Sequence, residues 1–344
     1  MIIVIIAGGA GTRLWPMSTR DNPKQILNVF GNESLLKNSY DRACTVTPEV
    51  YILPDKSTSA KAKKQIPALK EDYFIEEPSR RGTANCIIAA LAKLGSSHNH
   101  DEPIAFIHAD HFIRDQKGFA KTFKWGAQLS VNHKKIILVG AEPTGPSVNF
   151  GYIKKGNELP ENISAFEIAS FKEKPDFHTA VKYLNSGRYL WNCGYFIGSI
   201  NVFIESFKNF APDLHEKYQK LKAINGNDSK LFTETYNSFN DQTIDVALFE
   251  KTNNTLVVQA EFDWMDVGNF ENLHDISVKD AEGNYFSGNG INTIGIENSY
   301  IRNEEEKPIA IIGLNNVVVI NTKDGLLVSR IDVSHRVGEI AKKL

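Results

Sequence analysis

The sequence has few of the features that mark secreted, zinc-binding or membrane proteins. It contains only three cysteines, Cys44, Cys86 and Cys193, and no Cys-x-x-Cys pair. Three widely spaced thiols argue against a disulfide framework and a structural zinc site, and they favour a reducing compartment. The apolar run at the start lacks both a preceding basic region and a following small-residue cleavage site, so it is not typical of a signal peptide.

Two further features that the sequence lacks argue against membrane and nucleic-acid partners. No apolar run in the sequence is long enough to cross a bilayer as a helix. The formal net charge of −2 provides no basic field that would attract nucleic acid or an anionic membrane. We therefore expect a cytoplasmic protein that contacts neither nucleic acid nor membrane.

The length and the order of apolar segments predict two domains. The chain has 344 residues, enough for one large core and a smaller one. Up to about residue 280, short buried strands alternate with helices, which predicts an α/β domain over 1–280 with a Rossmann-like, doubly wound, mostly parallel sheet. Beyond it, short apolar runs separated by asparagine and glycine turns predict a small all-β domain over 281–344. That domain is expected to be solenoid-like, with a short sandwich as the alternative, and to end in a helix.

A glycine-rich turn follows the first predicted strand. Residues 2–6 are continuously apolar, as in a parallel strand that is buried on both faces. Gly8, Gly9 and Gly11 come directly after it and allow close backbone approach and positive φ angles. Unblocked N–H groups in such a turn can surround a phosphate, and the guanidinium of Arg13 can contact its oxygens.

Two common phosphate-binding motifs do not fit this turn. It lacks the Gly-Lys-Ser/Thr ending of a Walker A loop. A Rossmann dinucleotide motif would need a third glycine where Leu14 stands, so a dehydrogenase is disfavoured. Lys24 supplies a second cation near the turn, but an ordinary tight turn with two solvated cations explains the glycine spacing equally well.

Two carboxylates stand where a metal ion would be useful. Asp110 follows a buried strand, and ligands of open α/β sheets lie beyond the carboxyl ends of the strands. Asp266 belongs to a second acidic cluster with Asp263. For Asp263, as for Asp245, a capping or structural role is as plausible as a role in the site. The neighbours His108 and His111 suggest zinc, but no third thiolate or imidazole lies nearby in the sequence. Oxygen ligands beside phosphates favour Mg²⁺.

A second candidate anion site lies at the start of a predicted helix. Gly82 and Thr83 precede the apolar run 86–92, and two arginines, Arg80 and Arg81, come just before them. A helix N-terminus beside arginines suits a nucleotide or another anion. A capped core helix with two surface arginines is the simpler alternative.

The remaining polar features point to phosphate chemistry without a covalent intermediate. Asn192 interrupts an apolar strand and needs a hydrogen-bond partner, either backbone or ligand. The sequence shows no Ser-His-Asp order, no activated cysteine setting and no Schiff-base lysine motif, so nucleophilic catalysis by the protein is not indicated. Two carboxylates, nearby cations and a phosphate-binding turn together predict metal-assisted phosphate chemistry.

Several blocks of the chain resemble one enzyme family. The run AGGAGTRLWP at 7–16, with PKQ at 23–25, is similar to the signature of sugar-1-phosphate nucleotidylyltransferases. Its Leu-Trp-Pro ending looks most like mannose-1-phosphate guanylyltransferases. Further similar blocks, within about the first 275 residues, are HADHFI at 108–113, FGYI at 150–153, EKP at 173–175, WNCG at 191–194 and DWMDVG at 263–268.

The resemblance implies roles residue by residue. The implied nucleotide contacts are Gly8, Gly9, Gly11, Thr12, Arg13, Gly82 and Thr83. The implied catalytic cations are Arg13 and Lys24, and the implied Mg²⁺ ligands are Asp110 and Asp266. The implied sugar-phosphate contacts are Gly151, Glu173, Lys174 and Asn192.

The implied reaction is transfer of GMP from GTP to mannose 1-phosphate. It gives GDP-mannose and pyrophosphate by in-line displacement, without a covalent enzyme intermediate. The C-terminal solenoid of the family often joins subunits, so we expect a homodimer. Two departures weaken the assignment of guanine and of mannose: RRGTAN at 80–85 replaces the family's Gly-Arg-Asn-Thr-Ala-Pro, and Cys193 replaces a serine.

Alternatives remain within and outside this class. The acceptor could be another sugar 1-phosphate, such as a manno-heptose 1-phosphate, or the nucleotide could differ. A catalytically silent sugar-nucleotide-binding regulator would usually have lost a metal aspartate or the Arg/Lys pair. All four of these residues, Arg13, Lys24, Asp110 and Asp266, are present.

Overall fold

The computed structural model describes residues 1–9, 11–29, 31, 33–224 and 228–344. By their internal contacts, these residues form two compact units, each made of several chain segments. The first unit comprises Met1–Gly8, Ser39–Ala109 and Ile113–Trp264. The second unit comprises Gly9–Asn38, Asp110–Phe112 and Met265–Leu344.

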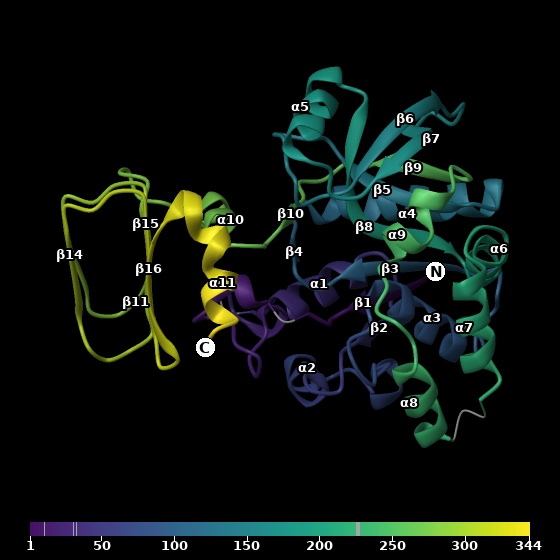
Figure 1. Ribbon diagram of the computed structural model, residues 1–344, viewed down its shortest axis with the longest axis horizontal. Helices are drawn as coiled ribbons and strands as arrows, with labels where there is room; N and C mark the ends of the chain where they lie inside the picture. Colours follow the sequence, from purple (N-terminus) through teal and green to yellow (C-terminus); the bar gives the residue numbers. More distant parts are fainter. Residues whose placement is uncertain (10, 30, 32, 225–227) are drawn as a thin grey trace. The chain divides into compact units, whose positions relative to one another are not determined.

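The first unit is built on an eight-stranded sheet with strand order β2-β1-β3-β8-β5-β9-β7-β6 (Figure 1). Its strands are β1 (Ile2–Ile6), β2 (Val50–Leu53), β3 (Pro103–His108), β5 (Ile136–Ala141), β6 (Tyr152–Glu158), β7 (Ala165–Lys172), β8 (Tyr189–Ser199) and β9 (Thr255–Gln259). The pairs β1–β2, β1–β3 and β5–β9 are parallel, as buried apolar strands predict. The strand β8 runs antiparallel to both β3 and β5, and β6 and β7 also join in antiparallel fashion.

Helices cover both faces of this sheet, as expected for a doubly wound α/β fold. Val4 of β1 belongs to the same core cluster as Ile87, while Phe123 packs against Tyr195 of β8 with ring centroids 5.7 Å apart. The helices of this unit are α2 (Ser59–Gln65), α3 (Thr83–Leu94), α4 (Gln116–His133), α5 (Phe177–Ser186), α6 (Ile200–Phe210), α7 (Pro212–Lys222), α8 (Ser229–Asn237) and α9 (Ile244–Ala247). Helix α1 (Leu35–Cys44) begins in the second unit and ends in the first.

Side-chain caps start several of these helices where the sequence changes from strand or loop to helix. Asp115 accepts a hydrogen bond from the backbone N–H of Gly118 at the start of α4, and Ser199 accepts one from Val202 at the start of α6. Such caps satisfy N–H groups that lack a partner within the helix. No helix among the described residues is both long and apolar enough to cross a membrane.

The second unit combines the signature segment with the C-terminal strands. It holds a short antiparallel ribbon of β4 (His111–Phe112) and β10 (Met265–Asp266). Its other elements are η1 (Thr12–Leu14), η2 (Lys24–Ile26), α10 (Phe270–Ile276), β11 (Tyr285–Gly288), β12 (Ile291–Ile294), β13 (Tyr300–Asn303), β14 (Ile309–Ile312), β15 (Val317–Thr322), β16 (Gly325–Arg330), η5 (Ile331–Arg336) and α11 (Val337–Ala341).

The C-terminal strands stack as the coils of a solenoid rather than as a sandwich (Figure 1). Strands β11, β13 and β15 pair in parallel, as do β12 and β14. The side-chain amide of Asn321 donates to that of Asn303 at 2.9 Å, and Asn298 donates to Asn316; both pairs are 18 residues apart. Strand β16 then folds back antiparallel to β15. The predicted α/β fold with a small all-β C-terminal domain is confirmed.

One apolar cluster joins the signature segment to these strands within the second unit. Leu14 and Met17 belong to the same buried cluster as Phe270, Tyr300 and Val337. The cluster thus contains side chains from both the start and the end of the sequence, and burial of its apolar area stabilises both segments together.

Candidate active site

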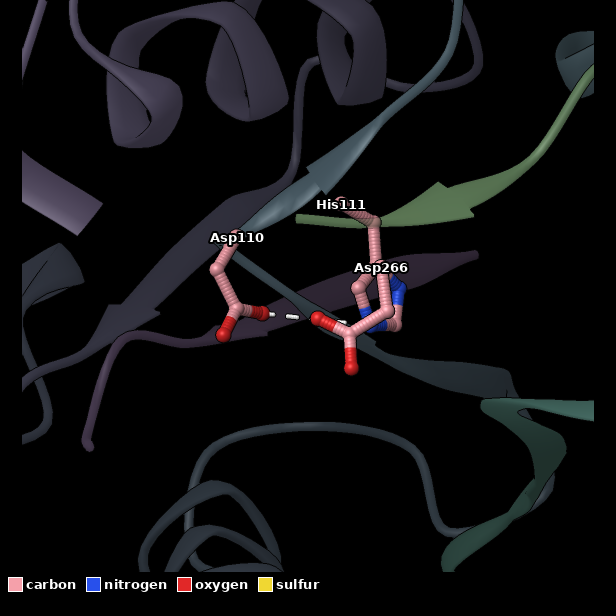
Figure 2. Close-up of side chains that lie close together, drawn as sticks. All are labelled: Asp110, His111 and Asp266. Carbon is pink, nitrogen blue, oxygen red and sulfur yellow. Dashed lines mark ion pairs between the residues drawn. The ribbon is translucent and has the colours of Figure 1, made fainter. Parts of the chain in front are cut away.

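The second unit brings the two predicted metal aspartates together. The pairing of β4 with β10 places Asp266 opposite His111, the residue that follows Asp110. One ligand atom from each of Asp110, His111 and Asp266 lies within 4.8 Å of the others. Figure 2 shows the two carboxyl groups and the imidazole directed toward one another. The group could hold a divalent metal ion, and His111, which in the sequence suggests only zinc, lies beside both carboxylates.

Lys24 lies between the two carboxylates. Its Nζ is 2.7 Å from Oδ2 of Asp110 and 3.3 Å from Oδ1 of Asp266, and it donates to the carbonyl of Val267 at 3.1 Å. The residue is only 8% exposed. Burial alone would lower its pKa, but the charges of Asp110 and Asp266 outweigh that effect, and the pKa is raised above its usual value. Lys24 is therefore a cation at neutral pH.

The same charges act on Asp266 in the opposite direction. Burial would raise the pKa of this carboxyl, and the negative charge of Asp110 adds to that effect. The ammonium of Lys24 is the strongest opposing influence, assisted by His111 and Arg13, and the pKa of Asp266 is lowered. An ionised carboxylate is the form that a metal ion binds.

The glycine turn folds tightly against Lys24. Gly9 has a φ of 125° and Gly11 a φ of 61°, which side chains rarely allow. A Cβ atom on Gly11 would lie 2.9 Å from the backbone nitrogen of Lys24. Thr12 then begins the helical turn η1. Of the predicted turn, Gly8 belongs to the first unit and Ala10 lies outside the described residues.

Arg13 lies beside the segment DWMDVG at 263–268, which contains Asp266. A Cβ atom on Gly268 would be 3.4 Å from its Nη1 and 3.5 Å from its Cζ. The guanidinium therefore lies close to the backbone only two residues after Asp266. Arg13, Lys24, Asp110 and Asp266, predicted from three separate blocks of sequence, thus belong to one group of residues in the second unit.

The first unit brings together three of the residues that are predicted to contact the sugar phosphate. A Cβ atom on Gly151 would lie 2.5 Å from Oε2 of Glu173 and 3.3 Å from Cβ of Asn192. The backbone N–H of Asn192 also donates to the carbonyl of Gly151 at 2.8 Å. The absence of a side chain at Gly151 is what allows Glu173 and Asn192 to approach this backbone.

Asn192 has two partners. Its Nδ2 donates to Oδ1 of Asp245 at 2.7 Å, and its Oδ1 accepts from the N–H of Gly194 at 3.0 Å. The Gly194 contact is the backbone partner that an amide in an apolar strand requires. Asp245 is not among the residues predicted for the site, because a capping or structural role is equally plausible from the sequence. The signals that point to it are a buried amide in need of a partner and an acidic residue at the start of a short helix.

Asp245 is an acid that binds its proton tightly. Burial raises its pKa, and the nearby negative charge of Glu173 raises it further, to about 7. The adjacent cation, Lys174, forms an ion pair with Glu173 at 2.8 Å, but its side chain is 59% exposed. Exposed charges are well screened, so Lys174 offsets little of the negative charge at Asp245. The amine remains open to an anionic ligand.

The predicted nucleotide segment 79–85 is held by contacts within the first unit. Arg80 forms an ion pair with Asp55 at 2.9 Å, so its charge is already matched. A Cβ atom on Gly82 would lie 2.2 Å from the carbonyl of Gln242, which only glycine permits. The hydroxyl of Thr83 accepts from the N–H of Ile244 at 3.0 Å. Thr83 thus fixes the start of helix α9, the helix that carries Asp245.

Asp263 has a structural role in the first unit. Its Oδ1 accepts hydrogen bonds from the backbone N–H groups of Arg114 and Asp115, both at 2.9 Å. These bonds hold the turn that precedes helix α4. The predicted residues therefore lie in both units, and the second contains the two aspartates predicted to bind metal and the two cations predicted to be catalytic.

Two family models match the chain, and both groups of predicted residues lie within the first match. The model of the nucleotidyl transferase family matches residues 2–283, and that of the mannose-phosphate isomerase/GMP-like β-helix domain matches residues 291–344. The first match alone covers most of the chain. The chain belongs to the nucleotidyl transferase family.

Individual relatives narrow the branch of the family. The mannose-1-phosphate guanylyltransferase of Klebsiella pneumoniae is 34% identical over 336 residues, which cover 95% of this chain and 70% of the relative. The xanthan biosynthesis protein XanB of Xanthomonas campestris pv. campestris (strain B100) is 33% identical, over 99% of this chain and 72% of the relative. The mannose-1-phosphate geranyltransferase structure from Thermus thermophilus is 26% identical and has a TM-score of 0.88, covering 99% of this chain and 98% of that one.

These comparisons confirm the resemblance that the sequence motifs indicated. The chain is an enzyme of the nucleotidyltransferase type, and its relatives include named mannose-1-phosphate guanylyltransferases. The group of Asp110, His111 and Asp266 lies within the part of the chain that the nucleotidyl transferase model matches.

Proposed function

We propose that the enzyme transfers GMP from GTP to mannose 1-phosphate and releases GDP-mannose and pyrophosphate. The observation that carries this proposal is the pair Asp110 and Asp266 with Lys24 between them, in a chain whose relatives bear this activity in their names. A phosphate oxygen of the sugar phosphate attacks the α-phosphorus of GTP in line, and the bond to pyrophosphate breaks. No side chain forms a covalent intermediate.

The protein contributes charge and position rather than bonds. Arg13 contacts the phosphates of GTP, and its guanidinium stabilises charge on the departing pyrophosphate. Lys24 offers its ammonium to the phosphate at the reacting centre, in the site where Asp110 and Asp266 now hold it. The N–H groups around Gly9 and Gly11 orient the triphosphate.

The donor set fits a divalent cation. Asp110 and Asp266 offer carboxylate oxygens within 4.8 Å of each other, and the lowered pKa of Asp266 keeps that group ionised at neutral pH. Bound there, Mg²⁺ would neutralise charge on the phosphate oxygens during the displacement. We propose Mg²⁺ because oxygen ligands beside phosphates suit it, with the imidazole of His111 available to orient a ligand or a bound water.

The sugar phosphate is assigned to the first unit. We propose that Glu173 and Asn192 accept and donate hydrogen bonds to sugar hydroxyls, with Gly151 allowing the ring to approach the backbone. Lys174, whose amine is exposed, binds the phosphate of the sugar. For the nucleotide, we propose contacts from Gly8, Gly82 and Thr83.

The proposal is tested by measuring pyrophosphate release with defined substrate pairs. GTP, ATP, UTP and dTTP are each combined with mannose 1-phosphate, glucose 1-phosphate and a manno-heptose 1-phosphate, in the presence of Mg²⁺, Mn²⁺ or Zn²⁺. We expect release with GTP and mannose 1-phosphate in Mg²⁺. The same assay with Asp110→Asn shows whether the release depends on the proposed metal site.

Other outcomes select the alternatives. Release with GTP and the heptose phosphate would support the proposed mechanism and show that the acceptor is not mannose 1-phosphate. Faster release in Zn²⁺ than in Mg²⁺ would show that the site prefers zinc to magnesium. Nucleotide binding without release from any pair would support the silent regulator.

We also propose an organisation and a location. Residues 1–280 would form the catalytic domain, and 281–344 would join two copies into a homodimer. Large apolar side chains are exposed on the C-terminal strands: Ile294, Ile312, Leu326 and Val328. Light scattering at micromolar concentration checks the dimer. A cytoplasmic location follows from three widely spaced cysteines that form no disulfide, and it stays a prediction.

A further inference from the structure

The C-terminal end of the chain contacts three consecutive residues of the signature. A Cβ atom on Gly338, in helix α11, would lie 3.2 Å from Cγ of Arg13. Leu14 shares a buried cluster with Val337. All of these residues belong to the second unit, so the contacts lie within one compact body.

The third contact is the closest. A Cβ atom on Gly325 would lie 2.7 Å from Cζ2 of Trp15 and 2.9 Å from its Cη2. Gly325 is the first residue of β16, at the turn after β15. The indole of Trp15 therefore lies against a backbone that no side chain covers.

Two glycines bracket Arg13 from different parts of the sequence. Gly268 adjoins the guanidinium, with a would-be Cβ 3.4 Å from Nη1, and Gly338 adjoins the aliphatic stem. Neither glycine has a positive φ angle, so the backbone conformation does not require glycine at either position. At Gly338 the reason left for glycine is space, because a Cβ atom 3.2 Å from Cγ of Arg13 would be closer than side chains usually pack. At Gly268 a Cβ atom would meet the guanidinium at an ordinary contact distance.

We propose that Gly338, at the start of helix α11, is a positioning residue for Arg13. The inference rests on the proposed function, because it assigns to Arg13 the contact with the nucleotide phosphates. The C-terminal segment then does more than join subunits: it sets the position of a cation that acts on the substrate. A shift of about 1 Å in such a group is enough to lower a rate roughly a hundredfold.

The experiment separates positioning from folding by exploiting helix propensity. Alanine is favoured over glycine inside a helix, so Gly338→Ala should raise or preserve Tm if only the fold matters. We expect Tm to be preserved while kcat/KM for pyrophosphate release and the affinity for the nucleotide both fall. Gly338→Leu should enlarge the loss to about tenfold or more. Glu339→Ala, an exposed neighbour on the same helix, is the matched control and should behave like the unmodified enzyme.

A double-mutant cycle tests whether the effect passes through Arg13. Arg13→Ala removes the stem that Gly338 contacts, so adding Gly338→Leu to it should change the nucleotide affinity less than about twofold. Equal losses in both backgrounds, or no loss from Gly338→Leu with Arg13 present, would overturn the proposal. If Gly338→Leu does not fold, Gly338→Ala in both backgrounds gives the same comparison.

The two proposals fail in different ways. Nucleotide affinity is measured by calorimetry with Mg²⁺ and whichever triphosphate the unmodified enzyme binds. Failure of GDP-mannose synthesis appears as missing turnover in the unmodified enzyme. Failure of the positioning role appears as unchanged affinity in the Gly338 variants.

Discussion

Each unit contains a pair of close carboxyl groups, and the two pairs differ in what lies between them. Asp110 and Asp266 have the buried ammonium of Lys24 at 2.7 and 3.3 Å, and the pKa of Asp266 is lowered. Asp245 lies beside Glu173, whose ion-pair partner Lys174 is exposed, and the pKa of Asp245 is raised to about 7. A buried cation decides whether neighbouring acids are ionised. These opposite shifts agree with the proposed roles, a metal ion at the first pair and hydrogen bonds to sugar hydroxyls beside the second.

The largest effect should come from removing one charge of the first pair. Asp110→Asn and Asp266→Asn should each lower kcat for pyrophosphate release by about a hundredfold or more, because each removes a proposed metal ligand and one negative charge beside the proposed phosphate site. The matched control is Asp263→Asn, which keeps an oxygen acceptor for the N–H groups of Arg114 and Asp115. A control variant as inactive as the other two would mean that the acidic segment acts through folding.

Removing the cation should make the first pair resemble the second. In Lys24→Met, Asp110 and Asp266 face each other without compensation, so we expect a lower Tm at pH 8 and a rate about a hundredfold lower. Added Mg²⁺ should raise Tm more in this variant than in the unmodified enzyme, because it replaces the missing charge. Thermal melts with and without Mg²⁺ measure this. The exposed Lys121→Met provides the control, and an equal Mg²⁺ effect in all three proteins would contradict the comparison.

The second pair should show its raised pKa as a dependence of stability on pH. An acid whose pKa is higher in the folded chain binds its proton more tightly when folded, so its ionisation lowers stability as pH rises from about 4 to about 7. Asp245→Asn removes this loss and keeps an acceptor for Asn192. We expect the variant to gain about 1–2 kcal/mol relative to the unmodified enzyme at pH 8, but little at pH 4.

Urea unfolding at both pH values measures this difference. The KM for the sugar phosphate should also change, whereas that for the nucleotide should not, since Asp245 holds Asn192 by a 2.7 Å hydrogen bond. A gain in stability that is the same at both pH values would show that Asp245 does not titrate in this range.

The smallest effect is expected beside the second pair. Cys193 follows Asn192 on β8, so its side chain points to the opposite face, where it is 1% exposed. Cys193→Ser should therefore leave the KM for the sugar phosphate within about twofold, while a buried hydroxyl costs about 1–3 kcal/mol of stability. Steady-state kinetics and a thermal melt measure the two quantities. A changed choice of sugar in this variant would show that Cys193 influences substrate selection.

The first pair could be predicted from the sequence, whereas the second could be predicted only in part. Asp110 follows a buried apolar strand, and the motif around Asp266 resembles a family block, so local sequence was sufficient for both. Asp245 contacts Asn192 from 53 positions away, and no local pattern records such a pair. The amide of Asn192 within an apolar strand predicted that a partner exists but not which residue provides it.

The direction of strand β8 and the repeat length of the solenoid could not be predicted from the sequence either. The strand β8 is buried on both faces whether it runs parallel or antiparallel to its neighbours, so its apolar run does not reveal that it pairs antiparallel with β3 and β5. The solenoid could not be distinguished from a sandwich, because the 18-residue offset of β13 to β15 and of β12 to β14 is not kept between β11 and β13, where Tyr285 pairs with Tyr300 at an offset of 15. A period needs several repeats before it stands out in a sequence.

The asparagine pairs of the solenoid limit the lengths of insertion that its strands can accept. Asn298 meets Asn316 and Asn303 meets Asn321 at the same spacing of 18 residues, so two pairs of like side chains hold the same two successive coils in register. An insertion of one complete coil would find its partners already in place, whereas an insertion of any other length would shift every following residue out of register. The tail is therefore a modular part, open to growth by duplication in whole turns.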